Sequence, residues 1–129
     1  MLLIGDVREK IKEIKDETIQ VICTSPPYWG LRDYGKDDQI GQEASPDEFV
    51  DAMVSLCREF KRVLRSDGTF WLNLGDTYFG AKGGHWSSDN SFTNDDTGGK
   101  YRESRKAPPK HPHLKTKDLV GVPWRVALG

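Results

Sequence analysis

Six consecutive residues, Thr24-Ser25-Pro26-Pro27-Tyr28-Trp29, are the best placed in the sequence to do chemistry. Because the two prolines have a fixed φ and no backbone N–H, the carbonyl groups of Ser25 and Pro26 form a rigid pair of hydrogen-bond acceptors. Tyr28 and Trp29 add flat aromatic faces beside them. Such residues can hold a flat ring and accept hydrogen bonds from an amino group on it. A simpler interpretation is that the prolines end a strand and the aromatics cover the edge of the core, and composition alone favours it.

A strand predicted at residues 19–23 positions this loop. Ile19-Gln20-Val21-Ile22-Cys23 is β-branched and almost continuously apolar, which is typical of a strand covered on both faces of a parallel sheet. Pro26 and Pro27 cannot continue the ladder, so the chain must leave the sheet at its carboxyl edge. Ligands of open α/β sheets bind at that edge, which makes the loop the first candidate site.

A second strand and a long helix complete a βαβ unit. Ser45-Pro46-Asp47-Glu48 combines a capping Ser, a Pro at the first helical position and a Glu in the reciprocal capping position. The predicted helix continues to Ser66-Asp67-Gly68, and residues 69–74 form the next buried strand. Its apolar stripe repeats at steps of four and three: Phe49, Met53, Leu56, Phe60 and Val63.

The predicted fold class is therefore α/β, a partial Rossmann-like sheet in which strands 19–23 and 69–74 are parallel and flanked by helices. Residues 2–4 are apolar and predict a further strand, displaced or paired elsewhere, followed by a short helix after Asp6. Residues 77–113 show no sustained periodicity and are expected to form a long polar and basic loop. A last helix is predicted from about Thr116, bent or delayed by Pro123.

Length and composition limit the class of protein. The chain has 129 residues, 36% of them hydrophobic and 30% charged, which excludes a two-domain enzyme and predicts one domain over residues 1–129. No apolar run approaches the roughly 20 residues that span a bilayer, and no secretory signal is recognisable, so we expect a cytoplasmic protein. Cys23 and Cys57 are too few for a disulfide framework and are expected to be reduced and packed as small hydrophobes.

The formal net charge of -1 hides an uneven distribution. Residues 1–99 contain 11 Lys/Arg against 18 Asp/Glu, whereas residues 100–117 contain seven Lys/Arg against one Glu. A compact basic segment suits a polyphosphate partner, although such a run is also typical of a solvated loop. If the partner is DNA, the candidate contact residues are Lys100, Arg102, Arg105, Lys106 and Lys110.

At residues 24–29 the sequence resembles the catalytic Ser-Pro-Pro-Tyr motif of the amino-group DNA methyltransferases, which methylate cytosine N4 or adenine N6. The neighbouring blocks resemble those family members in which the catalytic motif precedes the cofactor motif. These blocks are Gly5-Asp6, Asp67-Gly68-Thr69, the strand that ends in Asn73-Leu74-Gly75-Asp76, and the segment from Lys117 to Arg125. The resemblance covers almost the whole chain and constrains the loop at 77–113 least.

The resemblance implies roles for individual residues. The Ser25 side chain and the Pro26 carbonyl would accept hydrogen bonds from the N–H groups of the exocyclic amino group. Pro27 would restrict the backbone next to them. Tyr28 would stack on a base extruded from the duplex. The methyl donor would be S-adenosylmethionine, with Thr24 and Asp6 as the candidate cofactor contacts, although helix capping explains Asp6 without chemistry. No covalent intermediate is implied, so neither cysteine is expected to act as a nucleophile.

One part of the family pattern is missing from the sequence. No Gly-rich turn follows a strand, although this element is expected to hold the methionine part of S-adenosylmethionine. We therefore expect a truncated methyltransferase domain that is completed by further sequence, by another chain or by self-association. The Ser at the head of the motif favours cytosine N4 as target. The alternatives are adenine N6, or a non-catalytic module that binds nucleic acid or protein.

Three further side-chain expectations concern packing and metals. His85, His111 and His113 lack ligand spacing with the cysteines, so no metal site is predicted. Trp29 and Trp124 are expected to be packing residues rather than readers of bases. Trp86, in the polar loop beside the basic run, is a candidate aromatic for contact with unstacked bases. Asp6 and Asp76 each follow a predicted strand and have two alternative roles, helix cap or ligand contact.

Overall fold

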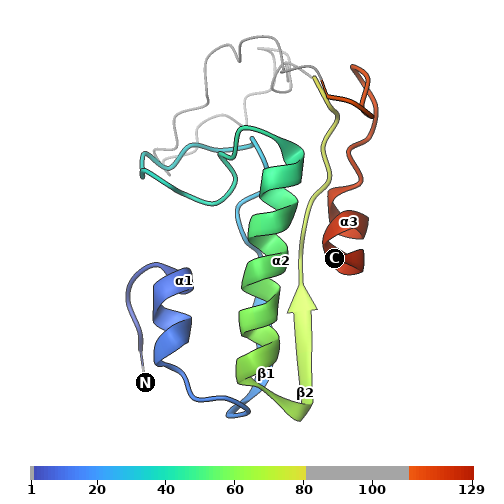
Figure 1. Ribbon diagram of the computed structural model, residues 1–129. Helices are drawn as coiled ribbons and strands as arrows, with labels where there is room; N and C mark the ends of the chain where they lie inside the picture. Colours follow the sequence, from blue (N-terminus) through green and yellow to red (C-terminus); the bar gives the residue numbers. More distant parts are fainter. Residues whose placement is uncertain (1, 81–110) are drawn as a thin grey trace, which may run out of the picture.

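The computed structural model describes residues 2–80 and 111–129 and confirms the α/β class. Its elements, in chain order, are helix α1 (Val7–Lys10), the 3₁₀ helix η1 (Ile11–Glu13), strand β1 (Ile19–Thr24), helix α2 (Pro46–Val63), strand β2 (Leu64–Leu72) and helix α3 (Val122–Leu128) (Figure 1). No helix in these two ranges is long and apolar enough to cross a membrane.

Strands β1 and β2 pair in parallel, as the sequence predicted. The register places Ile22 opposite Phe70 and Thr24 opposite Leu72. A hydrogen bond of 2.9 Å from the Asn73 N–H to the Thr24 carbonyl continues the ladder past β2. β2 begins at Leu64, five residues before the predicted start, and the register shifts between Ile19 and Val21. The two strands therefore end together, which brings the loops after them to one edge of the sheet.

Helix α2 has the predicted start. The Ser45 Oγ accepts from the Glu48 N–H at 3.2 Å, and the Glu48 carboxylate accepts from the Ala44 N–H at 3.1 Å. The predicted apolar stripe from Phe49 to Val63 is buried throughout. The helix ends at Val63 rather than at residues 66–68, because Leu64 is already extended and enters β2.

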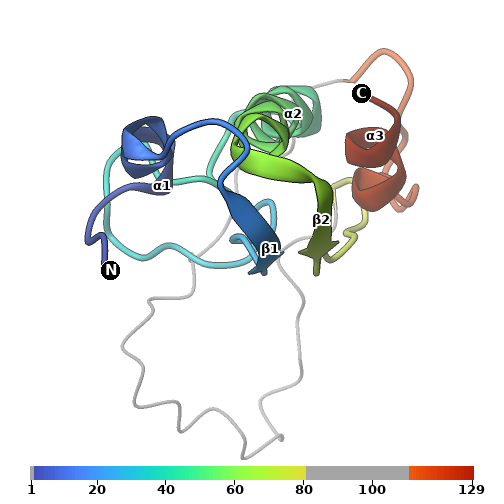
Figure 2. The same ribbon diagram turned by 90° about the horizontal axis from the view of Figure 1, so that it is seen from below.

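The core lies between α2 and one face of the sheet. Phe60 on α2 meets Phe70 on β2 edge to face, with ring centroids 5.3 Å apart, and Ile22 of β1 packs into the same cluster. A second cluster joins α2 to α3 through Phe49, Met53 and Val126. Helices α1 and α2 lie on the same side of the two strands (Figure 2). Burial of hydrophobic side chains thus holds the sheet from one side.

The expectation that the 19–23 strand is covered on both faces was wrong. Val21 is 56% exposed, Cys23 is exposed rather than packed, and Trp71 of the neighbouring strand is 65% exposed. On β1 the exposed Val21 and Cys23 alternate with the half-buried Ile22 and Thr24, and on β2 the half-buried Leu72 follows Trp71, which is the pattern of a sheet with one uncovered face.

Residues 2–4 do not form the predicted strand. Leu2 and Ile4 are 83% and 80% exposed, and none of the described residues pairs with this segment. An apolar run becomes a strand only where a neighbouring strand supplies its hydrogen bonds. The helix that follows does begin after Asp6, but it is short and passes into η1.

The last helix begins at Val122, six residues after the predicted start. Leu119 instead forms an antiparallel bridge with Tyr78, and both Lys117 and Gly121 have φ of 75°. This left-handed backbone interrupts the helical pattern that the side-chain spacing suggested. Trp124 is 73% exposed on α3, so its predicted packing role was also wrong.

Candidate functional site at the carboxyl edge of the sheet

The loop that leaves β1 is held by the segment just before α2. The Gly30 N–H donates to the Gly41 carbonyl at 2.6 Å, and the Trp29 indole N–H donates to the Glu43 carbonyl at 3.0 Å. Gly41 has a φ of +97°, and a Cβ on it would lie 2.9 Å from the Tyr28 carbonyl oxygen. The loop therefore approaches this segment closely enough to require glycine there, and Trp29 has the packing role predicted for it.

Tyr28 is fixed by the end of the neighbouring strand. A Cβ on Gly75 would lie 2.6 Å from both Cδ2 and Cε2 of the Tyr28 ring. The ring of this half-buried tyrosine thus rests on the bare backbone that follows β2. The sequence predicted both strand ends but gave no sign that Gly75 makes room for Tyr28.

The two proposed acceptors are not engaged by the described residues. Ser25 is exposed, Pro26 is half-buried, and no hydrogen bond from residues 2–80 or 111–129 reaches the Ser25 hydroxyl or the Pro26 carbonyl. The next residue, Pro27, is half-buried and lies against Gly41. A stiff corner with two available oxygens and an adjacent aromatic ring can accept hydrogen bonds from an amino group on a flat ring.

Of the two candidate cofactor residues, Asp6 caps α1. Its Oδ1 accepts from the Arg8 N–H at 2.8 Å, and the Arg8 guanidinium donates to both carboxylate oxygens. These hydrogen bonds lower the pKa of Asp6 to about 2. Thr24 is half-buried at the end of β1, where its carbonyl accepts the bond from Asn73. The capping alternative therefore accounts for the observed contacts of Asp6.

Asp76 serves as a cap for a distant helix. Its carboxylate accepts from the backbone N–H groups of Gly121 and Val122, both at 3.0 Å, and from that of Thr77 at 2.8 Å. Gly121 is the N-cap residue of α3 and has no side chain to satisfy these donors. Asp76 thus fixes α3 to the edge of the sheet, and its contacts in the structure are those of the capping alternative.

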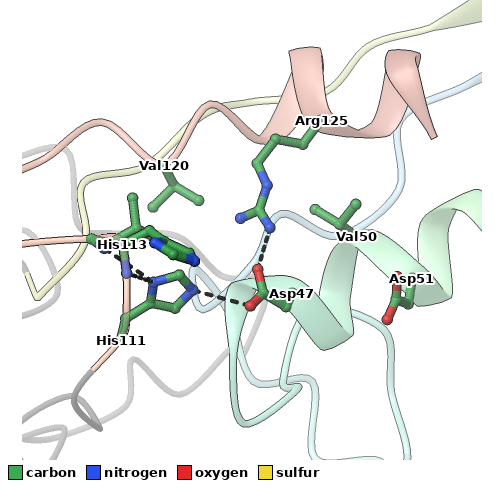
Figure 3. Close-up of a pocket in the computed structure, with 8 residues that line it drawn as sticks. Asp47, Val50, Asp51, His111, His113, Val120 and Arg125 are labelled. Carbon is green, nitrogen blue, oxygen red and sulfur yellow. Dashed lines mark hydrogen bonds and ion pairs between the residues drawn. The ribbon is translucent and has the colours of Figure 1, made fainter.

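Asp47, His111 and Arg125 form a polar cluster that the sequence analysis did not predict (Figure 3). The Asp47 carboxylate binds the Arg125 guanidinium and lies 3.0 Å from the His111 Nε2. The hydrogen bond from Arg125 is the main cause that lowers the pKa of Asp47 below its ordinary value. The His111 Nδ1 accepts from the N–H groups of His113 and Leu114, so Nε2 carries the proton donated to Asp47. The partners lie 64 and 78 positions from Asp47, which no local sequence signal reveals.

The remaining sequence predictions fall outside the described residues or find no test there. Lys100, Arg102, Arg105, Lys106 and Lys110 lie in the segment 81–110, which the structure does not describe, as do Trp86 and His85. Residues 77–80, the described start of the predicted loop at 77–113, meet the segment that follows the loop through backbone hydrogen bonds from Val120 to Thr77 and from Lys117 to Phe79. Among the described residues, no group of three or more His, Cys, Asp or Glu side chains is placed to hold a metal ion.

Comparison with known proteins decides the family. The sequence model of the N6 and N4 family of DNA methylases matches residues 19–116. The match begins at the first residue of β1, includes Pro26 and Pro27, and continues beyond α2. The chain belongs to this family of DNA methylases. Its resemblance to the amino-group methyltransferases, first indicated by residues 24–29, is thereby confirmed.

Individual relatives in the DNA methylase family are Type II methyltransferases. The chain is 43% identical over 127 residues to M.SmaI of Serratia marcescens and 40% identical over 124 residues to M.Cfr9I of Citrobacter freundii. These matches cover 98% and 96% of the chain but 41% and 39% of the relatives. The chain thus spans about two fifths of the length of the curated relatives it matches. No solved structure matches it.

Proposed function

We propose that the chain is the catalytic-loop part of a DNA methyltransferase that methylates the exocyclic amino group of an extruded base. The observation that carries the proposal is the exposed corner at the end of β1, where Ser25 and Pro26 present oxygens that the described residues leave unbonded. Membership of the DNA methylase family supports this assignment.

The chemistry follows from what an exocyclic amino group needs. Its lone pair is delocalised into the aromatic ring, which makes the nitrogen a poor nucleophile. The Ser25 Oγ and the Pro26 carbonyl accept hydrogen bonds from its two N–H groups and draw the nitrogen toward a tetrahedral geometry. The nitrogen lone pair then forms the N–C bond as the S–C bond of the donor breaks, and the nitrogen loses one of the two protons to solvent. Because Pro26 and Pro27 restrict the backbone, these acceptors are preorganised and need little rearrangement during the reaction. Tyr28, held on Gly75, stacks on the extruded base.

The methyl donor of this family is S-adenosylmethionine, which supplies an electrophilic methyl group when bound. The chain's own residues fit only part of such a site. Thr24 lies at the strand end next to the acceptors, whereas both carboxylate oxygens of Asp6 are bound to Arg8. No Gly-rich turn follows β1 or β2, since β1 runs into the Pro-Pro loop and β2 into Asn73-Leu74-Gly75. We therefore assign Thr24 to the edge of the cofactor site, keep Asp6 as the cap of α1, and leave the centre of the cofactor site to polypeptide beyond this chain.

We further propose cytosine N4 as the target, because Ser rather than Asp heads the motif. The basic residues Lys100, Arg102, Arg105, Lys106 and Lys110 are proposed to contact DNA phosphates. Such contacts make DNA affinity fall steeply as salt rises.

The test uses the chain fused to the remainder of the Serratia relative, in place of that relative's matched segment. Methyl transfer from tritiated S-adenosylmethionine to DNA is measured, and the digested nucleosides are separated to identify the methylated base. We expect N4-methylcytosine, and a fall of about 100-fold in kcat for Ser25→Ala, comparable to the loss of one oxyanion-hole donor. Ser66 is also exposed but lies on β2, away from the proposed acceptors. Ser66→Ala is therefore the matched control and should leave turnover unchanged. Full turnover in Ser25→Ala would refute the proposed role.

A further inference from the structure

The corner at the end of β1 packs directly on residues 40–46, which we call the supporting segment. A Cβ on Gly41 would lie 2.9 Å from the Tyr28 carbonyl oxygen, so no side chain separates the two stretches of backbone. Ile40 packs against both hydrophobic clusters of the core, and Pro46 is fully buried at the start of α2. The supporting segment is therefore fixed to the core at both of its ends.

A glutamate closes the turn within the supporting segment. The Glu43 Oε2 accepts from the Gly41 N–H at 2.9 Å, a bond between groups only two residues apart. Gly41 has a φ of +97°, so the backbone turns there in a conformation that glycine adopts readily. A carboxylate is a stronger acceptor for an N–H than a neutral oxygen. The half-buried Glu43 side chain thus holds the backbone of its own segment in this turn.

Two further hydrogen bonds connect this turn to the corner. The Gly41 carbonyl accepts from the Gly30 N–H at 2.6 Å, and the Glu43 carbonyl accepts from the Trp29 indole N–H at 3.0 Å. On the other side of the corner, the Thr24 carbonyl is bonded to the backbone that follows β2. The residues between these two anchors contain both proposed acceptors.

We propose that Glu43 is a positioning residue for methyl transfer, whose carboxylate fixes the turn that holds the oxygens of Ser25 and Pro26 in place. The inference rests on the proposed function, because it concerns the acceptors named there. Pro26 and Pro27 restrict φ but leave ψ free to change, so the corner needs a fixed point on each side. The sheet provides one, and the turn closed by Glu43 provides the other.

The alternative is that the Glu43 carboxylate contacts a substrate directly, because Glu43 also lines a cavity together with Arg8 and Lys36. Glu43→Gln separates the two roles. The side-chain oxygen of glutamine still accepts from the Gly41 N–H, but glutamine carries no charge. A positioning residue therefore tolerates Gln and not Ala, whereas a charge that binds substrate is lost in both variants.

The experiment uses the same fusion to the remainder of the Serratia relative, and kcat and KM for DNA are measured at a temperature where every variant is folded. We expect Glu43→Ala to lower kcat about tenfold or more with KM unchanged, because the acceptors are displaced. Glu43→Gln should keep most of the turnover. Glu59 is also half-buried and accepts from the Arg62 Nε at 2.8 Å, near the other end of α2, so Glu59→Ala is the matched control and should change neither constant. Equal losses in Glu43→Gln and Glu43→Ala would overturn the proposal in favour of direct contact.

A double-mutant cycle shows whether Glu43 acts through the acceptors. In a Ser25→Ala background one acceptor is already absent, so Glu43→Ala should lower kcat by a smaller factor there. The same factor in both backgrounds would contradict the positioning role. The proposed function fails separately, through full turnover in Ser25→Ala alone.

Hydrogen exchange tests the anchor without any need for turnover. The exchange rates of the Gly30 amide and the Trp29 indole N–H are measured by NMR in the same fusion. We expect Glu43→Ala to accelerate both about tenfold or more, and Glu59→Ala to leave both unchanged. Unchanged rates in Glu43→Ala, or equal acceleration in the control, would overturn the proposal whether or not the fusion methylates DNA.

Discussion

At the residue scale, the contact between Gly75 and Tyr28 makes the clearest prediction. A methyl group on residue 75 would lie 2.6 Å from two ring carbons of Tyr28, so Gly75→Ala must displace the ring. We expect a loss of about 1–3 kcal/mol in the free energy of unfolding, the usual cost of forcing extra volume into a packed site. Urea denaturation measures it.

A double-mutant cycle isolates this contact from other effects of Gly75→Ala. In a Tyr28→Ala background the ring is absent, and Gly75→Ala should then cost little. The same cost in both backgrounds would show that the strand end, rather than the tyrosine, requires glycine at this position.

What the sequence predicts about single residues depends on how local the contacts are. The Ser45 and Glu48 caps were predictable because their partners lie within four residues. The bonds between Asp47 and its partners His111 and Arg125 were not, because they join positions far apart in the chain. The corner at Ser25 was recognisable since its chemistry is contained in six consecutive residues, whereas the support from Gly75 comes from the next strand.

At the scale of elements, Asp76 holds α3 to the end of the sheet. Its carboxylate accepts from two backbone N–H groups of the first turn of α3. Asp76→Ala leaves these donors without that acceptor, and we expect a loss of about 1 kcal/mol in the free energy of unfolding, as for loss of other N-caps. Asp76→Asn keeps an acceptor and should lose less. Asp51→Ala, at an exposed position of α2, is the control, and an equal effect there would contradict the capping role.

Asp47 joins α2, α3 and the segment that begins at His111. Because hydrogen bonding lowers its pKa in the folded state, ionised Asp47 stabilises the fold above its ordinary pKa of 3.8. This contribution is lost as the pH falls below that value. At pH 7 we expect Asp47→Asn to lower the free energy of unfolding by at most about 1 kcal/mol, since half-exposed ion pairs are screened by solvent.

The pH dependence separates the Asp47 ion pair from other effects of the substitution. The difference between the original chain and Asp47→Asn should shrink as urea denaturation is repeated from pH 6 down to about pH 3. A difference that stays constant over that interval would mean that the charge of Asp47 is irrelevant to the cluster.

Element prediction succeeded where local pattern and pairing agreed. β1 and α2 carry strong signals, β-branched residues in one and a capped apolar stripe in the other, and both are present. Residues 2–4 carry an apolar signal without a pairing partner among the described residues, and they form no strand. The helical spacing from Thr116 onward was overridden by the left-handed backbone at Lys117 and Gly121. Periodicity thus locates faces better than it locates ends.

At the scale of the whole molecule, the described residues cover only one face of the sheet. The sequence predicted two buried faces, because the apolar runs of β1 and β2 are those of a parallel sheet with helices on both sides. The described residues cover only the face toward α2. The mismatch follows if the apolar run is suited to a covered sheet while the layer that covers it lies in polypeptide beyond this chain, which the match to about two fifths of the relatives supports.

Phe70 and Trp71 test this one-sided arrangement directly, since the two neighbours point to opposite faces. Phe70 packs edge to face on Phe60, whereas Trp71 is 65% exposed. In the isolated chain we expect Phe70→Ala to lower the free energy of unfolding by about 2 kcal/mol, less than for a fully buried phenylalanine. Trp71→Ala should change it by less than about 0.5 kcal/mol, as for other surface substitutions. Urea denaturation of both variants at one protein concentration measures the difference. If Trp71→Ala cost as much as Phe70→Ala, the Trp71 side chain would already be buried within the chain. A sheet that is covered only on the face toward α2 would then be wrong.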